Sequence, residues 1–372
     1  MDSQPLPLVS IVTPIYNEAQ HLADCVESIL AQTYQNWNYT IVDNCSTDGS
    51  VEIARQYAAR DGRIRVLENR QFLPALSNFN HALRQVSPAS KYCKVVLGDD
   101  WLFPECLERM VALAEEHPSV GIVSAYVLKE NKISCAGLPA QSTFIPGREI
   151  CRKHFLEELY VFGSPTTVLY RADLVRSHDP FYNEANIHAD TEVCFVLLKT
   201  SDFGFVHQVL TFSRVRPDSR SATDTDYQTD FGGFLESLLR HGPAYLTPVE
   251  LNVRLAQHLS GYYSYLGKSI ILHRDKMFWR YHKAKLTEAG VGFSRIRATG
   301  AALAAALDAA LNPKNSVEKL LKRRKNRNRA RTPDSTPIAT SGLEDWAASG
   351  GHTQKTGPKA VKEDSQAVCN GR

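Results

Sequence analysis

The stretch VVLGDDWLFP, residues 95–104, indicates how this chain folds. The apolar run VVL, residues 95–97, ends an expected β-strand over residues 93–97. Asp99 and Asp100 follow it, and Pro104 is a favourable first residue for a helix that we expect to continue to about residue 116. Two neighbouring carboxylates resist burial without a partner, so their position between a strand and a helix calls for a structural or functional reason.

The same alternation of strand and helix recurs on both sides of this stretch. The expected strands cover residues 8–13, 39–42, 64–67, 93–97 and 120–127, and the expected helices cover 22–30, 49–60, 75–86 and 104–116. The strands are almost continuously apolar, which is expected when both faces of a parallel sheet are covered. The sequence therefore predicts an α/β fold with a mostly parallel sheet flanked by helices.

The remainder of the chain is less regular. Residues 166–170 and 205–212 are expected to be strands around a helix at 191–198, and residues 231–311 have a helical pattern. We therefore expect an α/β domain over residues 1–220 and a helical C-terminal region over 221–311. Residues 312–372 begin with a basic segment and continue with few large apolar residues, so we expect a basic, disordered tail.

Composition restricts the partners and the compartment. The 372 residues carry a net charge of only +3, and the basic stretch lacks interleaved aromatic residues, so we expect no nucleic-acid binding. No signal-peptide core begins the chain, and no apolar run reaches the roughly 20 residues of a membrane span. Eight cysteines without metal-ligand spacing are typical of free thiols in a reducing compartment, so we expect a cytoplasmic protein.

The basic stretch KLLKRRK, residues 319–325, has two interpretations. It is either a solvated tail or a surface that contacts anionic lipid headgroups. The second interpretation would place the protein peripherally at the inner face of the membrane, and both stay open at this point.

Polar clusters follow three of the expected strands: TPIYNE at residues 13–18, DNCSTDG at 43–49, and the acid pair. Ligands of open α/β sheets bind at the carboxyl ends of the strands, so these clusters would lie along one edge if the sheet is parallel. Ser46 and Asp48 are equally suited to capping the next helix. Asp43 stands directly at a strand end, where its carboxylate could accept hydrogen bonds from a ligand.

The acid pair and a later acidic segment each allow two explanations. Asp99 and Asp100 suit a hard divalent cation such as Mg²⁺ or Mn²⁺, but acids also complement the N-terminus of a helix. The segment HADTE, residues 188–192, precedes an apolar helix, and Asp190 could simply cap it.

Together these segments resemble the family 2 glycosyltransferases. The resemblance rests on PIYNE, VDNCSTDGS with SILAQTYQNW upstream, LGDDWLFP and HADTE, and it covers roughly residues 8–220. It implies a GT-A fold, Rossmann-like, with a nucleotide-sugar half at about 8–127 and an acceptor half at about 128–220. It also implies an inverting enzyme that moves a sugar, usually from a UDP-sugar, to a hydroxyl of a glycan or lipid-linked acceptor in polysaccharide, glycolipid or cell-envelope glycan synthesis.

The resemblance assigns donor-binding roles to the first strand ends. Pro14, Tyr16 and Glu18 match the first nucleotide-contacting segment of the family. Asp43 matches the acid that hydrogen-bonds the base, and Asn78 lies in the helix before the acid pair, where the family often has asparagine.

The resemblance also implies the groups around the reaction centre. Asp99 matches the acid that contacts the ribose, and Asp100 matches the ligand of a divalent cation that bridges the diphosphate. Asp190 matches the general base of inverting members. Arg216, with Ser219 in the segment RVRPDSRS, matches a late segment that lies near the diphosphate.

The sequence departs from the family pattern at two positions, and it leaves one competing function open. Leu97 and Ala189 stand where many members have an acid, so the metal contact is left to Asp100 and the surroundings of Asp190 differ. The absence of GxGxxG after the first strand argues against a dinucleotide dehydrogenase. The alternative function is a catalytically silent protein that binds sugar nucleotides or glycans.

Overall fold

The computed structural model describes residues 6–216, 228–272 and 274–311. These residues fall into two compact units, each described by itself below. The first comprises residues 6–215 and His241–Thr247, and the second comprises the described residues of Arg216–Arg240 together with residues 248–311. The expected tail, residues 312–372, and Ser219 lie outside the described residues.

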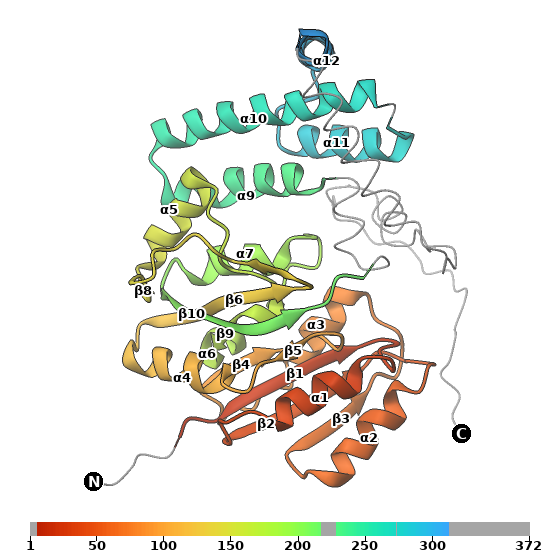
Figure 1. The fold of residues 1–372 in the computed structure, drawn as a ribbon, viewed down its shortest axis with the longest axis vertical. Coiled ribbons are helices and arrows are strands. Elements are labelled where there is room, and N and C mark those ends of the chain that lie inside the picture. Colours follow the sequence, from red (N-terminus) through yellow and green to blue (C-terminus); the bar gives the residue numbers. More distant parts are fainter. Residues whose placement is uncertain (1–5, 217–227, 273, 312–372) are drawn as a thin grey trace, which may run out of the picture. The chain divides into compact units, whose positions relative to one another are not determined.

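The first unit is built on one ten-stranded sheet with the order β3-β2-β1-β4-β9-β6-β10-β5, to which β7 and β8 add at β6 and β10 (Figure 1). Its strands are β1 (Val9–Ile15), β2 (Trp37–Asp43), β3 (Ile64–Glu68), β4 (Tyr92–Val95), β5 (Trp101–Leu102), β6 (Val120–Lys129), β7 (Lys132–Ser134), β8 (Phe144–Ile145), β9 (Leu169–Arg171) and β10 (Asp202–Ser213).

The pairing confirms the predicted mostly parallel sheet. β1 pairs in parallel with both β2 and β4, β2 with β3, and β6 with β10. β9 lies between β4 and β6 and is antiparallel to both, so β4 and β6 run in the same direction. The short strand β5 is antiparallel to the end of β10.

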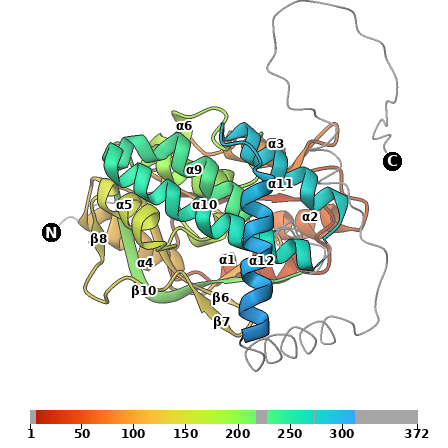
Figure 2. The ribbon, with the colours of Figure 1, turned by 90° about the horizontal axis from the view of Figure 1, so that it is seen from above.

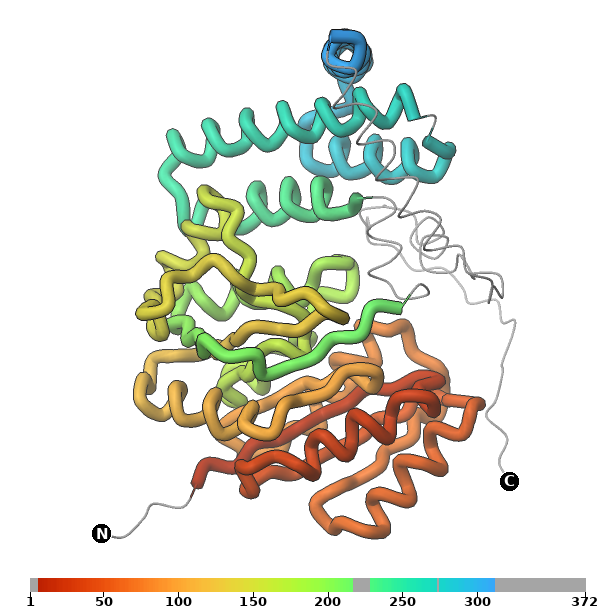
Figure 3. Tube along the Cα trace, in the orientation of Figure 1, coloured from red at the N-terminus to blue at the C-terminus, as the bar shows by residue number. Residues whose placement is uncertain are grey.

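Helices connect these strands, and the chain can be followed from β1 through α1 to β2 in Figure 3. They are α1 (Leu22–Leu30), α2 (Ser50–Arg60), α3 (Ala75–Leu83), α4 (Cys106–Glu116), α5 (Gly147–Glu157), α6 (Ala172–Arg176) and α7 (Ala189–Leu197), with a 3₁₀ turn η1 (Pro165–Thr167). In α1, the fully buried residues Leu22, Val26 and Ile29 recur at helical spacing and join the main core cluster.

The acid pair lies in a tight turn between β4 and β5, and the following helix begins later than expected. Trp101 and Leu102 pair with β10, and the Trp101 ring stacks on Phe212 with centroids 3.6 Å apart. The Phe103 amide donates to the carbonyl of Leu210. The chain is therefore held to the sheet edge before α4 can start, at Cys106 rather than at Pro104.

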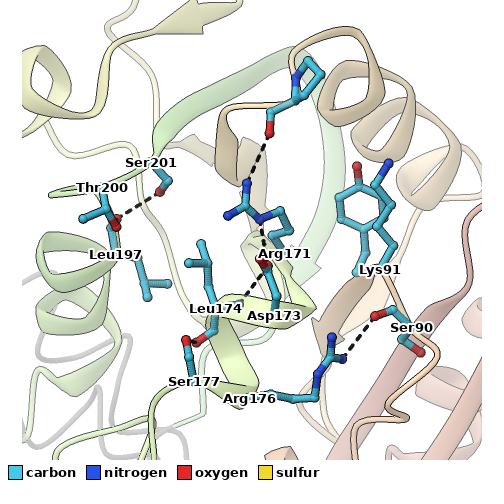
Figure 4. A network of polar contacts seen from close by, with 12 residues as sticks. Ser90, Lys91, Arg171, Asp173, Leu174, Arg176, Ser177, Leu197, Thr200 and Ser201 are labelled. Carbon is cyan, nitrogen blue, oxygen red and sulfur yellow. Dashed lines mark hydrogen bonds and ion pairs between the residues drawn. The ribbon is translucent and has the colours of Figure 1, made fainter.

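Hydrogen bonds hold the short helix α6 and the residue before it to the segments that precede β4 and β6 (Figure 4). Arg171 donates to the carboxylate of Asp173 at 2.7 Å and to the carbonyl of Pro118 at 3.2 Å. Arg176 donates to the carbonyl of Ser90, just before β4, at 3.1 Å. These contacts fix the antiparallel strand β9 between β4 and β6.

The second unit is helical. It contains α9 (Asp230–Tyr245) up to Arg240, and all of α10 (Pro248–Ile271), α11 (Lys276–Glu288) and α12 (Arg295–Leu311). An aromatic and leucine cluster that includes Tyr262, Leu266 and Phe278 forms its core. α12 crosses α10, as Figures 1 and 2 show, and an open groove of about 790 Å³ lies between them.

Two further expectations can be compared with the structure. Among the described residues, no helix is both long and apolar enough to cross a membrane. The described cysteines are free thiols, and all of them except Cys45 are buried. The residue ranges that we assigned to domains remain predictions.

Candidate active site

The register of the sheet brings the three polar clusters to one edge. Ile15 at the end of β1 is paired with Asp43 at the end of β2, and on the other side of β1, Val12 is paired with Val95 at the end of β4. Because these strands are parallel, the segments that follow them leave the sheet in the same direction. The polar residues after β1, β2 and β4 therefore form one candidate site.

The loops after β1 and β2 are joined by hydrogen bonds. The Asn17 and Glu18 amides donate to the hydroxyls of Ser46 and Ser50, at 2.9 and 2.8 Å. The Ala19 amide donates to the Asp48 carboxylate at 2.9 Å. Asp48 also accepts the Ser50 amide in the first turn of α2, at 3.1 Å. Ser46 and Asp48 thus hold two loops together, and Asp48 supports the start of the helix as well.

Asp43 is a buried carboxylate with one committed oxygen. Asp43 is only 2% exposed, and its Oδ2 accepts a hydrogen bond from the Ser46 amide at 3.0 Å. Oδ1 is buried and has no hydrogen-bond partner among the described residues. Burial raises the pKa of the Asp43 carboxyl above its usual range. An unpaired buried acceptor is costly, so this oxygen points to a donor that arrives with a ligand.

Asn78 belongs to an amide network behind Asp43 that the sequence did not reveal. Asn69 Nδ2 donates to the side-chain oxygens of Asn44 and Asn78, at 2.9 Å each. Asn44 also exchanges hydrogen bonds with the backbone of Leu73, at 2.8 and 2.9 Å. The network ties the ends of β2 and β3 to α3, so Asn78, which is 4% exposed, supports the edge from behind.

The three candidate residues of the first segment lie in different environments. Pro14 is buried within β1, and Tyr16 is 47% exposed with its ring edge-on to Phe72, 4.9 Å between centroids. Glu18 packs closely against Gly98. A Cβ on Gly98 would lie 3.0 Å from Glu18 Cγ, so the missing side chain lets the loop after β1 approach the acid pair.

Asp100 differs from Asp43, because protein groups use both of its oxygens. Oδ2 accepts the hydroxyl of Thr166 at 2.6 Å, and Oδ1 accepts the amide of Arg214 at 3.0 Å. Asp100 is 1% exposed, and burial together with the neighbouring charge of Asp99 raises its pKa to about 7. Asp99 is more exposed than Asp100.

The arginine that the structure places beside the acid pair is Arg214. Its Nε donates to the carbonyl of Asp99 at 3.3 Å, its Nη2 lies 3.6 Å from the carboxylate of Asp24, and its guanidinium lies 5.4 Å from the centroid of the Trp101 ring. Arg216, which the sequence suggested, is two residues further on and is the last described residue before the gap at 217–227. A role for Arg216 remains a prediction.

The acid pair fits one kind of divalent-cation site. Within the described part of the chain, no group of three or more His, Cys, Asp or Glu side chains could enclose a metal. Mg²⁺, however, is commonly held by one or two carboxylates and completed by substrate phosphates and water. Asp99 and Asp100 at a strand end fit that arrangement, Asp100 through the lone pairs that remain on oxygens already accepting from Thr166 and Arg214. They do not fit a cage made by the protein alone.

The segment from Tyr160 to Thr167 links the acid pair to Asp190. Thr166 donates to Asp100, and the Tyr160 hydroxyl contacts the Gly163 carbonyl at 2.9 Å and the Thr191 hydroxyl at 3.4 Å. Lys94, fully buried on β4, secures the segment by donating to the carbonyls of Thr166 and Val168, at 2.6 and 3.1 Å.

Asp190 is the second residue of α7, partly buried at the start of the helix. Its Oδ1 accepts the Thr191 amide at 2.7 Å, so part of its role is local support of the first turn. Burial raises the pKa of the Asp190 carboxyl, while the charges of His188 and, more weakly, Lys129 lower it. A carboxylate with a raised pKa is a stronger base than an exposed one.

Glu192 and Asn80 hold the loop that leads to Asp190, and sequence reasoning missed both. The Glu192 carboxylate accepts from Asn183 and Asn186, at 3.0 and 2.8 Å, and lies 3.3 Å from Nε2 of His241. Asn80 on α3 donates to the carbonyl of Tyr182 at 2.9 Å. The HADTE pattern marks Glu192, but its partners become visible only when the chain is folded.

Comparison with known proteins agrees with this geometry. Residues 10–178 match the family model described as "Glycosyl transferase family 2". These residues are a glycosyltransferase family 2 domain. EpsE of Bacillus subtilis, which is named as a glycosyltransferase, is 36% identical over 132 residues, 35% of this chain and 47% of EpsE. Glycosyltransferase GlyG of Streptococcus pneumoniae is 34% identical over 121 residues, 32% of this chain and 39% of GlyG.

Solved structures share the fold of the glycosyltransferase domain at lower sequence identity. TarS of S. aureus, solved in complex with UDP-GlcNAc, superposes with a TM-score of 0.56 at 17% identity, covering 78% of this chain and 85% of the TarS chain. Its complex with UDP gives 0.54 at 18% identity, with 78% and 84% covered. The match confirms the predicted GT-A fold. The chain spans about half of EpsE and less than half of GlyG.

Proposed function

We propose that this protein is an inverting glycosyltransferase that transfers a sugar from a UDP-sugar to a hydroxyl of a glycan or lipid-linked acceptor. The observation that carries the proposal is Asp43, whose Oδ1 is buried at the binding edge and has no hydrogen-bond partner within the described residues. The imide N–H of uracil is a donor of the kind that would satisfy this oxygen.

The names of similar proteins support the same substrate class. TarS was solved with UDP and with UDP-GlcNAc. In this chain Asp43 and the acid pair follow the ends of parallel strands, which is where open α/β sheets bind their ligands. TuaG of Bacillus subtilis, 34% identical over 122 residues, is named for teichuronic acid biosynthesis. The proposal includes a donor half at about residues 8–127 and an acceptor half at about 128–220. It also places the reaction in polysaccharide or cell-envelope glycan synthesis.

The diphosphate of the donor would lie by the acid pair. Asp100, together with Asp99, would hold a divalent cation, Mg²⁺ or Mn²⁺, completed by diphosphate oxygens. Such a cation supplies positive charge that offsets the charge on the leaving nucleoside diphosphate. Arg214, held against Asp99 and Trp101, brings a fixed positive charge to the same place.

Asp190 would act as the general base. Its carboxylate takes the proton of the acceptor hydroxyl while that oxygen forms a bond to the anomeric carbon and the bond to the diphosphate oxygen breaks. A single displacement of this kind inverts the anomeric configuration. Burial raises the pKa of Asp190, which brings its basicity closer to that needed near neutral pH.

Turnover of UDP-sugars with and without Mn²⁺, measured by release of UDP, tests the proposal. We expect Asp190→Asn to lower kcat by roughly 10²- to 10⁴-fold while the affinity for UDP-sugar stays within a few-fold of wild type. Asp173→Asn, an equivalent change in the exposed side chain of α6, should leave both unchanged. Binding of UDP-sugars without any transfer or hydrolysis would instead favour a silent binding protein, and full activity of Asp190→Asn would remove Asp190 from the role of base.

The pH profile provides a second test of Asp190. A base must be deprotonated, so kcat/KM should rise with pH through a pKa above the usual range of aspartate. The charge of His188 lowers this pKa, so His188→Gln should move the rising limb to higher pH. An unchanged limb in His188→Gln, or a limb in the ordinary range of aspartate in wild type, would contradict the assignment.

A further inference from the structure

Helix α12 presents its small residues inward and its large apolar residues outward. Ala298 faces α10 and is 1% exposed, and the two helices approach so closely that a Cβ on Gly267 would lie 2.5 Å from the backbone carbon of Ala301. Small residues at the crossing of the two helices permit this distance. This is the reverse of an ordinary surface helix, which turns its large apolar side chains toward the core.

The outward side of α12 carries a continuous apolar stripe. Ile296 is 85% exposed, Leu303 67%, Leu307 63% and Leu311 79%. Their spacing of seven, four and four residues, at about 100° per residue, places all four within an arc of about 80° on the side opposite Ala298. Single exposed leucines are common, but an aligned row of four on one helix face marks an interaction surface.

The sequence that follows this stripe is strongly basic. Residues 314–331 contain nine Lys and Arg and one Glu, whereas the other residues together carry 34 basic and 39 acidic side chains. The positive net charge of the chain therefore comes from the segment that follows α12 in the sequence. No helix of the described residues is long and apolar enough to span a bilayer, so a membrane contact here would lie at the surface.

We propose that α12 binds the surface of an anionic lipid bilayer, with the stripe Ile296, Leu303, Leu307 and Leu311 entering the headgroup–acyl boundary. The cations of residues 314–331 would contact the negative headgroups beside it. An anionic bilayer offers both apolar depth and negative charge, and the chain carries the matching stripe and basic segment one after the other in its sequence. A second copy of the chain could cover the stripe, but outside residues 314–331 it has only five more acids than bases, and its own basic segment would repel the first. The inference does not depend on the proposed transferase activity.

The test is flotation of the full chain with vesicles of phosphatidylcholine alone and with vesicles of equal parts phosphatidylcholine and phosphatidylglycerol. We expect binding to the anionic vesicles only, weakened by high salt. Leu307→Glu and Leu303→Glu should each lower the affinity for anionic vesicles by roughly tenfold. Ile133→Glu, at a residue 53% exposed on β7, is the matched control and should bind like wild type.

Each other outcome has a defined meaning. Equal binding to both vesicle types, no binding by wild type, or wild-type binding by both leucine variants overturns the proposal. A wild-type dimer that Leu307→Glu converts to monomer, without any effect on vesicle binding, assigns the stripe to a second copy instead and also overturns it. Melting temperatures of the variants equal to wild type exclude misfolding, because the substituted side chains are exposed. A chain lacking residues 312–372 should lose most of its affinity for anionic vesicles, and unchanged binding there would contradict the role of the basic segment.

Discussion

Asp43 and Asp100 are both buried carboxylates near the ends of two strands that flank β1, yet the protein uses them differently. Asp100 gives one oxygen to the Thr166 hydroxyl and the other to the Arg214 amide. Asp43 accepts the Ser46 amide with one oxygen and leaves the other buried without a partner in the described chain. The two sites stand on β2 and β4, which flank β1 in the same sheet.

The difference separates a carboxylate with both oxygens hydrogen-bonded to the protein from one that keeps a whole oxygen for a ligand. Asp100 joins the turn after β4 to η1 and to the end of β10, so its removal should mainly lower the free energy of unfolding. Asp43 keeps an unpaired buried oxygen, which is costly to the fold, so its removal should mainly lower the affinity for the ligand. Substitutions that change one property without the other test this distinction directly.

The largest effect is expected for Thr166→Val. The substitution keeps the shape of the side chain but removes the donor to Asp100 and the acceptor that the Leu97 amide uses at 3.1 Å. Two buried polar groups then lose a partner, so we expect the free energy of unfolding to fall by about 2–4 kcal/mol. Chemical denaturation measures it.

Thr211→Val is the matched control for this change. Thr211 is also fully buried, on β10, but its hydroxyl has no hydrogen-bond partner in the described structure. Its substitution should be neutral or stabilising. Equal destabilisation by the two variants would show that the Asp100–Thr166 contact contributes nothing specific to the fold.

Asp43→Ala should weaken donor binding more than it lowers stability, the opposite of what we expect for Thr166→Val. The loss of one charge-assisted hydrogen bond to the donor should weaken UDP-sugar binding by about 10- to 100-fold, since such bonds contribute about 1.5–3 kcal/mol. The stability should change by less than about 1 kcal/mol, because the costly unpaired oxygen is removed together with the Ser46 contact. Calorimetric titration and chemical denaturation measure the two quantities.

The control for Asp43 removes an acid at the same sheet edge. Glu68, paired with Asp43 across β2 and β3, is partly exposed and forms an ion pair with Arg55. Glu68→Ala should leave donor affinity nearly unchanged. If Asp43→Ala binds UDP-sugars like wild type, Asp43 is not the base-recognising residue, whatever its effect on stability.

The sequence contained most of what places Asp43. The apolar run before it predicts a strand, the polar run after it predicts the strand end, and the parallel order follows from the alternation with helices. Its neighbours in the site, Ser46 and Asp48, are within five residues. Local pattern was sufficient here because the relevant contacts are local or follow from strand order.

The partners of Asp100 could not be found in the same way. Thr166 and Arg214 are 66 and 114 residues away in the chain, and no local pattern marks either one. The resemblance directed attention to Arg216, whereas the pairing of β10 with β5 brings Arg214 to the acid pair. A two-residue strand such as β5 is too short to produce a periodic signal, so its effect on the start of α4 was also missed.

Helix α12 shows a second limit of sequence patterns. The helical pattern expected over residues 231–311 includes α12, in which leucines recur every four residues along one face. The usual rule assigns that face to the core. The close crossing with α10 at Gly267 selects the alanine face instead, and this choice depends on a helix that ends more than twenty residues earlier.

The smallest expected effect is that of Gly98→Ala, which probes the β1 loop between the two carboxylates. The new Cβ would lie 3.0 Å from Glu18 Cγ and 3.1 Å from Ile15 Cγ2, so Glu18 must move by a few tenths of an ångström. We expect a few-fold loss of UDP-sugar affinity and a destabilisation of about 1 kcal/mol. Gly62→Ala is the control, because nothing lies within 4 Å of a Cβ at that position. Unchanged affinity in Gly98→Ala would show that Glu18 is not in contact with the donor, and would leave recognition to Asp43 and the acid pair.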